Sequence, residues 1–381
     1  MRQPRLRVVD VRHIREKDSE QQTVLMIQVE NEVGYLGWGR DRSSEANRMF
    51  SAPIPGTLVR SLQERRFQLP PELSSHFKEH GRTWSDMFGD VANEVFMAWN
   101  YAIYIEAAAH AAKQEYALPM YINAQLPAPL EKAGEYPSGG PHPYFLEIYR
   151  AASPSIDFTS PDIYWPDFEY WVQRYEIPGN PIFIPEARME SAPYNAYYAY
   201  GGARAFGFSA FGIDSLRAPQ DDQPEPVLMQ VYGLFESVRD LLLSAQASGS
   251  TRGLVLHTTS PRPTQTVPLG GYLFEATLSR SWPAKNLLAD DGAMLIMQTG
   301  TGEFYIAGSG LTVSFARDPD VEPGMAGIES IEQVSRHAGQ WTTEKRLNGD
   351  QSNQGRQLLL DPHQQHIFRV RLYSIPLAPR S

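Results

Sequence analysis

The sequence predicts an α/β part built from parallel βα units, followed by an all-β sandwich. Up to about residue 248, apolar strand-like runs alternate with helix-like segments, which is the pattern of parallel βα units. Beyond that point, short β-rich runs such as Gly253–Leu256 and Glu303–Ala307 alternate with Gly, Pro and Asp turns, as in a sandwich. We therefore expect two domains, residues 1–248 and 249–381.

The first elements can be assigned from periodicity. Residues 6–15 have the spacing of an amphipathic helix, and residues 23–29 form an apolar run bounded by turn signals, typical of a buried parallel strand. A long loop to about residue 88 follows, in which four prolines block long helices. The later expected elements are a helix over 93–116, strands over 118–126, 155–164, 181–186 and 205–213, and a closing helix over 225–247 that Gly249 ends.

Composition excludes several classes of function. The chain has 381 residues, of which 42% are hydrophobic and 20% charged, so it can bury a large core. A net charge of −10 without a basic cluster argues against nucleic acid or an anionic membrane as a partner. The absence of cysteine excludes disulfides, thiolate catalysis and Cys-ligated zinc. No run of 18 apolar residues predicts a membrane span, and no signal peptide is visible, which leaves periplasmic, secreted and cytoplasmic locations open.

Two of the apolar runs end in glutamate, at Glu32 and at Glu186. Barrel enzymes place their chemistry at the carboxyl ends of such strands. A retaining glycosidase needs two carboxyl groups about 5–5.5 Å apart, one ionised to attack the anomeric carbon and one protonated to assist the leaving oxygen. Burial and mutual repulsion would push the two pKa values apart in that sense. The alternative is that each is a solvated glutamate at a strand end.

Several motifs together resemble glycoside hydrolase family 35, the β-galactosidases. The main motifs of this resemblance are Val29-Glu30-Asn31-Glu32 followed by Gly34, and Ile184-Pro185-Glu186 far downstream. Five further segments come in the order of the family's bacterial branch, which carries a C-terminal β domain: Arg40–Ser43, Phe96–Trp99, Pro119–Ala124, Ser138–Pro141 and Ser160–Tyr164. The resemblance covers nearly the whole chain. It implies a TIM-type (β/α)8 barrel with a β-sandwich, and a retaining enzyme that removes terminal β-linked galactose from oligosaccharides or glycans by double displacement.

The same resemblance assigns catalytic roles and exposes a gap. In the family's superfamily the acid/base follows barrel strand 4 and the nucleophile follows strand 7, so Glu32 would be the acid/base and Glu186 the nucleophile. Only about twenty residues precede the strand that ends at Glu32, although a full barrel takes about 250 residues. We therefore expect a partial barrel that lacks the first three βα units. Its open strand edges make a second copy of the chain a candidate partner.

That gap leaves a second function open. Strands 1 to 3 of a complete barrel would supply part of the sugar-binding wall, including contacts that separate galactose from glucose, fucose or xylose. The alternative to an active enzyme is a non-catalytic remnant, or a carbohydrate-binding fragment that needs a complementing chain.

Five further residues are predicted to bind substrate. Asn31 is expected at the sugar 2-hydroxyl, although a turn amide is its alternative. Tyr164 could donate its hydroxyl to Glu186, and Trp165 could stack on a sugar face, with packing as the alternative for both. Asn123 ends a strand and could contact substrate or hold a loop. Glu30 could make a buried hydrogen bond or a sugar contact.

No cofactor or metal is expected. His76 and His80 have the i, i+4 spacing that can bind zinc on a helix, but they lack the HExxH pattern and a third ligand. A solvated helix face is the better interpretation. The chain also has no glycine-rich phosphate loop and no Gly-x-Ser-x-Gly elbow, so phosphoryl transfer and Ser-esterase chemistry are not supported.

Overall fold

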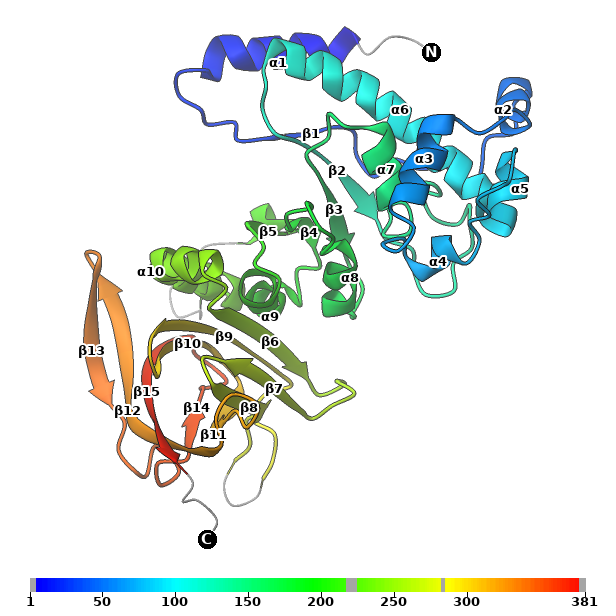
Figure 1. The fold of residues 1–381 in the computed structure, drawn as a ribbon. Helices are drawn as coiled ribbons and strands as arrows, with labels where there is room; N and C mark the ends of the chain where they lie inside the picture. The colour runs from blue at the N-terminus through cyan, green and yellow to red at the C-terminus, as the bar shows by residue number, and fades with distance from the viewer. Residues whose placement is uncertain (1–4, 217–224, 282–284, 377–381) are drawn as a thin grey trace. The chain divides into compact units, whose positions relative to one another are not determined.

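The computed structural model describes residues 5–216, 225–281 and 285–376, and the side chains from residue 9 onward within those ranges. The chain divides into two compact units, Met1–Glu186 and Ala187–Ser381 (Figure 1). This division falls earlier than the expected domain boundary at residues 248 and 249, which stays a prediction.

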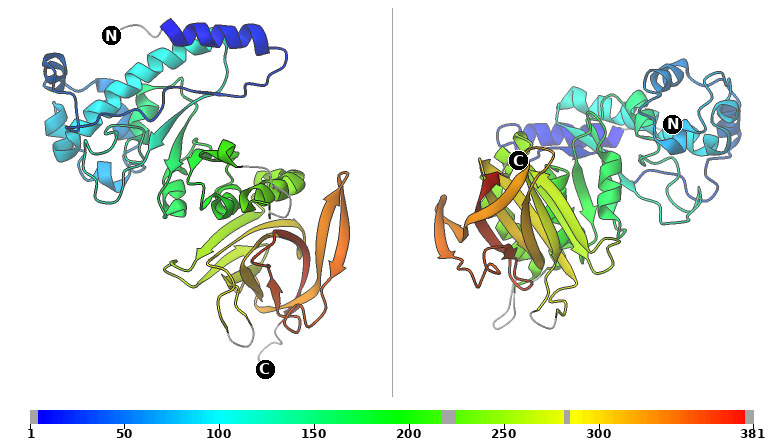
Figure 2. Two further views of the ribbon diagram at one scale, coloured as in Figure 1. Left: turned by 180° about the vertical axis from the view of Figure 1, so that it is seen from behind. Right: turned by 60° about the horizontal axis from the view of Figure 1, so that its bottom comes forward.

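In the first unit two helices that are far apart in the sequence lie along each other, α1 (Arg5–Asp18) and α6 (Ala92–Glu115) (Figures 1 and 2). Alanines such as Ala108 and Ala112 are buried on α6, and small side chains allow a neighbouring helix to approach closely. Nη2 of Arg12 lies 2.6 Å from Oε1 of Glu115, which adds an exposed ion pair to the same contact. The helices predicted over residues 6–15 and 93–116 are confirmed.

The segment between β1 and α6 is more ordered than the predicted loop. It contains four short helices and a 3-10 turn: α2 (Ser44–Phe50), α3 (Gly56–Glu64), α4 (Pro71–Ser74), α5 (Trp84–Phe88) and Gly89–Val91. Pro71 opens α4, where its missing N–H would have no helical partner. Prolines therefore limit the length of these helices without preventing them, and Leu58, Leu62 and Trp84 bury their side chains in the core of the unit.

A five-stranded sheet runs in the order β1-β2-β3-β4-β5. Its strands are β1 (Ile27–Gln28), β2 (Met120–Gln125), β3 (Phe158–Ile163), β4 (Phe183–Ala187) and β5 (Gly207–Ala210). β1 pairs with β2, and β2 with β3, in parallel. The helices α7 (Leu146–Ala152) and α8 (Phe168–Tyr175) follow β2 and β3 in the chain. The predicted parallel α/β part is thus present as an open sheet, with β1 much shorter than the strand expected over 23–29.

The two faces of this sheet have different roles. Met120 and Ile122 of β2 pack into the helical core. On the other face Tyr121 stacks on Phe158 of β3 at a ring-centroid distance of 5.3 Å, and Phe183 of β4 meets both rings edge-on. Because side chains alternate along a strand, the next residues on this face are polar ones nearer the carboxyl ends of the strands.

The second unit begins with helices and continues as two antiparallel sheets. The helices are α9 (Ala192–Tyr197), a π-helix (Tyr198–Gly202), a 3-10 turn (Ile213–Ser215) and α10 (Val227–Ala247). The six-stranded sheet has the order β13-β12-β15-β10-β9-β6 and the four-stranded sheet the order β14-β11-β8-β7. Their strands are β6 (Thr251–His257), β7 (Thr264–Leu269), β8 (Tyr272–Leu278), β9 (Asp291–Gly300), β10 (Glu303–Ser309), β11 (Leu311–Arg317), β12 (Gly324–His337), β13 (Gln340–Arg346), β14 (Gln357–Leu359) and β15 (His366–Pro376).

One apolar core joins the two sheets, as in a sandwich. Phe274 of β8 packs against Phe304 of β10 with ring centroids 5.0 Å apart, and Val313 and Val370 are buried in the same cluster. Gly253 of β6 allows a close approach, because a Cβ there would lie 2.0 Å from the carbonyl oxygen of Tyr197. The predicted antiparallel β part is confirmed.

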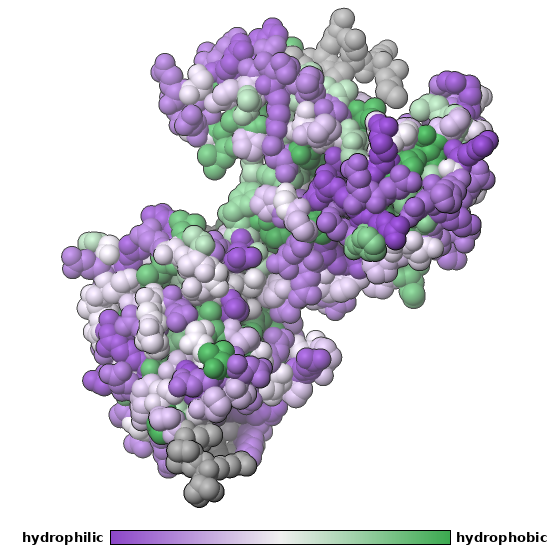
Figure 3. Space-filling model, viewed as in Figure 1, coloured by the Kyte–Doolittle hydropathy of each residue, from purple (hydrophilic) through white to green (hydrophobic). Residues whose placement is uncertain are grey.

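Among the described residues, no helix combines the length and hydropathy needed to cross a bilayer. Large apolar side chains are exposed at the surface. Figure 3 shows hydrophobic patches among hydrophilic residues on the visible face of the first unit. In the first unit, Leu25, Trp38 and Leu130 are exposed by 73%, 73% and 97%, which is unusually high for large apolar side chains.

Candidate active site

Three carboxyl groups meet near the carboxyl ends of the parallel strands. They belong to Glu32 after β1, Asp162 on β3 and Glu186 on β4, and one oxygen of each lies within 4.8 Å of the other two. All three residues belong to the first unit. The structure therefore brings together the two glutamates singled out in the sequence, and it adds a third acid between them.

The backbone after β1 is bent into unusual conformations. Glu30 and Glu32 have φ angles of +64° and +45°, in the left-handed region that side chains other than glycine rarely adopt. Such conformations cost on the order of 1–3 kcal/mol each and persist where the surroundings hold them. Here the N–H of Glu32 donates to Oδ1 of Asn123 at 3.0 Å, which fixes the bend against β2.

Asn123 uses its whole amide group to connect the site. It is 1% exposed, and its Nδ2 donates to Oδ1 of Asn31 at 2.9 Å and to Oδ2 of Asp162 at 2.7 Å. Together with the bond from the N–H of Glu32, these contacts engage both the donor and the acceptor of the amide. These contacts hold the loop after β1, and a contact of Asn123 with substrate stays a prediction.

Tyr164 hydrogen-bonds to Glu186. Its hydroxyl donates to Oε2 of Glu186 at 2.6 Å. Burial, followed by the hydrogen bond and the charge of Glu186, raises the pKa of Tyr164 well above its usual range, so the hydroxyl keeps its proton and remains a donor.

The other three predicted residues lie around this core. Asn31 is exposed, and its Oδ1 also accepts from Nε2 of Gln28 at 3.0 Å. Glu30 turns to α6, where Oε1 accepts from the Tyr104 hydroxyl at 2.9 Å, and its sugar contact stays a prediction. Trp165 is half-buried and donates from Nε1 to the carbonyl of Leu126 at 3.2 Å, which fixes its ring beside the end of β2.

Burial and mutual charge perturb the carboxyl groups. Burial raises the pKa of Glu32, a hydrogen bond with Asp162 opposes this rise, and the Glu186 charge adds to it. Burial, with the charges of Glu186 and Glu32, raises the pKa of Asp162 to about 9. Burial, with the charges of Asp162 and Glu186, raises the pKa of Tyr121 to about 12. At neutral pH Asp162 therefore retains a proton that an isolated carboxylate would lose.

This protonation bears on what the cluster can bind. Three carboxyl groups at such distances are an arrangement that a divalent cation can use when all are ionised. The raised pKa of Asp162 favours neutralisation by a proton instead. Perturbed carboxyl groups gathered at the ends of parallel strands are typical of sites for acid and base chemistry.

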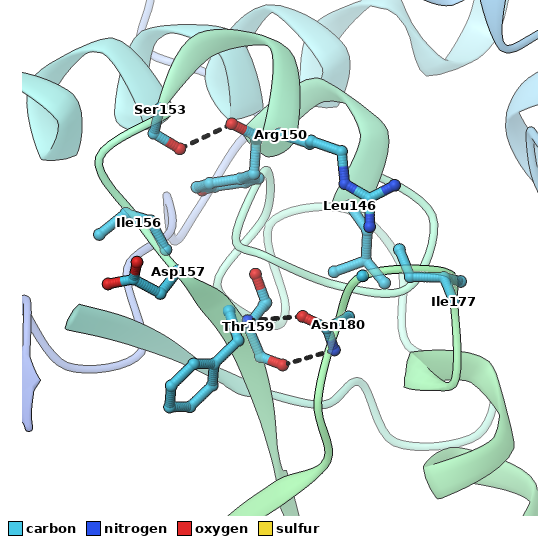
Figure 4. Close-up of a pocket in the computed structure, with 11 residues that line it drawn as sticks. Leu146, Arg150, Ser153, Ile156, Asp157, Thr159, Ile177 and Asn180 are labelled. Carbon is cyan, nitrogen blue, oxygen red and sulfur yellow. Dashed lines mark hydrogen bonds between the residues drawn. The ribbon is translucent and has the colours of Figure 1, made fainter. Parts of the chain in front are cut away.

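A small cavity and a larger groove of the first unit lie outside the cluster. The cavity, of about 40 Å³, opens at the amino end of β3, where Oδ1 of Asn180 accepts the Thr159 N–H at 2.8 Å and its Nδ2 donates to the Thr159 carbonyl at 3.0 Å (Figure 4). The groove, of about 490 Å³, borders the outer edge of β1 and is lined by Val11, Ile14 and Asn31 among others. The first cavity fits little more than water, and the groove reaches the site residues at Glu30 and Asn31.

Asp162 is the site residue that sequence reasoning missed. It lies inside the segment Ser160–Tyr164, which resembles the family. It falls within a strand, whereas the sequence pattern points only to polar residues at strand ends. The available signal was parity, since Asp162 lies two residues before Tyr164 and shares a strand face with it.

Comparisons with known protein families and solved structures find only limited similarity to this chain. A family described as "Domain of unknown function (DUF5597)" matches residues 228–359, all in the second unit and outside the carboxyl cluster. No curated protein matches the chain. A solved structure of a glycosyl hydrolase family 2 (GH2) member from Bacteroides cellulosilyticus DSM 14838 aligns with 98% of this chain at 8% identity and a TM-score of 0.29. The chain spans 51% of that structure, and a likeness at this TM-score defines neither fold nor function.

Proposed function

We propose that this chain carries the active site of a retaining glycoside hydrolase of β-galactosidase type. Glu186 is the nucleophile and Glu32 the general acid/base. In the first step the Glu186 carboxylate bonds to the anomeric carbon while the glycosidic bond breaks and Glu32 protonates the leaving oxygen. In the second step water displaces Glu186 and Glu32 takes the proton of that water.

The observation that carries the proposal is the approach of the two glutamates. One carboxyl oxygen of Glu32 and one of Glu186 lie within 4.8 Å of each other, and this close approach supports the short separation of about 5–5.5 Å that retention requires. The Tyr164 hydroxyl supports an ionised Glu186, and the raised pKa of Glu32 supports a proton donor. Terminal β-linked galactose as the substrate rests on the resemblance of the Glu32 and Glu186 motifs to family 35.

Hydrolysis of an aryl β-galactoside tests this function. We expect the purified full chain to release the phenol, and Glu186→Gln to fall to the background rate. Glu64→Gln is the matched control, because this carboxyl is exposed at the end of α3 and outside the site. Turnover that survives Glu186→Gln would exclude the proposed nucleophile.

Trapping identifies the nucleophile directly. A 2-deoxy-2-fluorogalactoside with an activated leaving group should label the chain covalently, because the fluorine slows both steps while the activated leaving group speeds only the first. Intact-mass and peptide measurements should place one sugar on Glu186 and none on Glu186→Gln. Release of the α anomer as the first product of an ordinary substrate would contradict retention.

The open sheet favours a second candidate, a fragment that becomes competent only with a complementing chain. β1 is the last strand of its sheet, and the groove of about 490 Å³ borders its free edge. A folded chain that neither hydrolyses nor is labelled, but binds galactosides in calorimetry, would support this alternative. Association of copies through that edge would appear in sedimentation velocity.

A further inference from the structure

A third carboxyl group lies inside the proposed site and has no part in the two-glutamate mechanism. Asp162 is 1% exposed on β3. Its Oδ2 accepts from Nδ2 of Asn123 at 2.7 Å. Its Oδ1 is buried and receives no N–H or hydroxyl hydrogen bond from the described residues. A buried ionised oxygen without a donor is costly, so this atom needs either a proton of its own or a cation.

The carboxyl group of Glu32 is a neighbour of Asp162, with one oxygen of each within 4.8 Å, and a side-chain hydrogen bond between the two carboxyl groups contributes to the raised pKa of Asp162. Two ionised carboxylates cannot hydrogen-bond to each other, because each offers only acceptors. One proton between them changes the contact from repulsion into a charge-assisted hydrogen bond. Asn123 can donate only to Oδ2, so Oδ1 is the oxygen that is left to hold this proton.

We propose that Asp162 is a neutral carboxylic acid throughout the reaction and donates its proton as a hydrogen bond to Glu32, which makes it a positioning residue for the acid/base. This inference rests on the function proposed above. Asp162 keeps its proton in both steps. After Glu32 has protonated the leaving oxygen, the Asp162 hydroxyl stabilises the resulting Glu32 carboxylate, and it releases that bond when Glu32 takes a proton from water. The three carboxyl groups thus share one negative charge and two protons before the first step.

The groups that face Asp162 come from each element around it. Glu32 follows β1, Tyr121 lies on β2, Tyr164 directly follows β3 and Glu186 lies on β4, while Tyr175 of α8 also interacts with the charge of Asp162. The tyrosines keep their protons because burial raises the pKa of each. Glu186 is needed as an anion, so a proton on Asp162 relieves the charge of the cluster without disabling the nucleophile.

Substitutions of Asp162 test the proposal through the direction of a pH shift. Asp162→Asn keeps an acceptor for Asn123 and a neutral donor for Glu32. We therefore expect kcat/KM within about 5-fold of that of the natural chain, and no shift in the alkaline limb of the pH profile of kcat/KM. Asp162→Ala removes the donor. It should lower kcat/KM by about 10- to 100-fold, as for loss of a hydrogen bond to a charged group, and move the alkaline limb to higher pH. The loss should be larger for poor leaving groups than for dinitrophenyl galactoside.

The outcomes separate a neutral Asp162 from the alternatives. If Asp162 were an anion at working pH, both substitutions would remove a repulsive charge and move the alkaline limb to lower pH. If its role were only structural, Asp162→Ala would lose activity with an unchanged pH profile. Asp167→Asn is the matched control, since Asp167 is exposed beyond the end of the same strand and makes no capping hydrogen bond.

A second measurement does not depend on turnover. The 13C carboxyl resonance of Asp162, identified by its absence from Asp162→Asn, should have the position of a protonated acid at pH 7 and titrate near pH 9. An ionised signal at pH 7 overturns the proposal. Ionisation that requires Ca²⁺ or Mg²⁺ and is reversed by EDTA would assign a cation site instead. A protonated signal in a chain without activity would uphold the state of Asp162 and refute the enzyme function.

Discussion

The side-chain carbonyl of Asn123 accepts the backbone N–H of Glu32 at 3.0 Å, so a buried amide on β2 holds the conformation of the proposed acid/base. The same side chain donates to Asp162 on β3. A single residue in the middle of the sheet therefore fixes both partners of the carboxyl pair, although it needs no contact with a substrate.

The first prediction concerns this amide. Asn123→Ala should lower the free energy of unfolding by ~2–4 kcal/mol, because it leaves the Glu32 N–H and Asp162 Oδ2 without partners. Urea unfolding measures this change. Gln125→Ala is the control, since Gln125 is the exposed last residue of the same strand. A loss of stability no larger than that of the control would refute the role of Asn123.

Tyr164 provides a prediction on activity. Tyr164→Phe removes the hydroxyl that donates to Glu186 at 2.6 Å while keeping the ring. We expect kcat/KM to fall by about 10- to 100-fold, the cost of one hydrogen bond to a charged group. Tyr170→Phe, at an exposed tyrosine of α8, should leave the rate unchanged. Equal rates for both variants would show that the hydroxyl does not act on Glu186.

How far the sequence predicts this molecule depends on whether a feature is local. The helix α6 and the strands β2 to β5 follow from apolar periodicity within single segments, which is why their positions are confirmed within a few residues. The short β1 does not follow from it. β1 ends at Gln28, and Glu30 beyond it has a positive φ that extended strand backbone does not adopt; its side chain contacts Tyr104 of α6.

The site residues differ in the same way: some follow from the local sequence, and others only from contacts between elements. Glu32 and Glu186 could be selected because each ends an apolar run, and Tyr164 because it follows β3. Asp162 could not be selected by that rule, because its chemistry arises from neighbours on two other elements. Burial and the charges of Glu186 and Glu32 perturb it, and only the assembled sheet brings these groups together.

A buried histidine gives a prediction on acid stability. His142 is 1% exposed, its Nε2 lies 2.9 Å from the Pro137 carbonyl, and its buried Nδ1 has no partner among the described residues. Burial lowers the pKa of His142 to about 4. The unfolded chain, with a usual value near 6.5, binds the proton first, so stability falls as the pH drops from 6.5 towards 4.

We therefore expect the chain to lose ~2 kcal/mol of unfolding free energy through His142 between pH 7 and pH 5. His142→Gln keeps a donor for the Pro137 carbonyl but cannot take up the proton, so its loss over this range should be smaller by that amount. Urea unfolding at both pH values measures the difference. His110→Gln, at an exposed histidine of α6, is the control, and a variant that follows the natural chain would exclude His142 as the cause.

The last prediction links the charge state of Asp162 to stability. Burial and the neighbouring carboxylates raise the pKa of Asp162 to about 9, far above its unfolded value near 3.8. The folded state then binds more protons than the unfolded state between these values, so the contribution of Asp162 to stability is lost as the pH rises through this window.

Asp162→Asn has no proton to lose. It should be more stable than the natural chain at pH 8, and this advantage should shrink towards pH 4. Urea unfolding at several pH values measures the trend against Asp167→Asn, whose stability difference from the natural chain should not change with pH in this way. A stability difference for Asp162→Asn that is constant over the range would mean that Asp162 ionises normally in the folded chain, and its proposed hydrogen bond to Glu32 would then have to be abandoned.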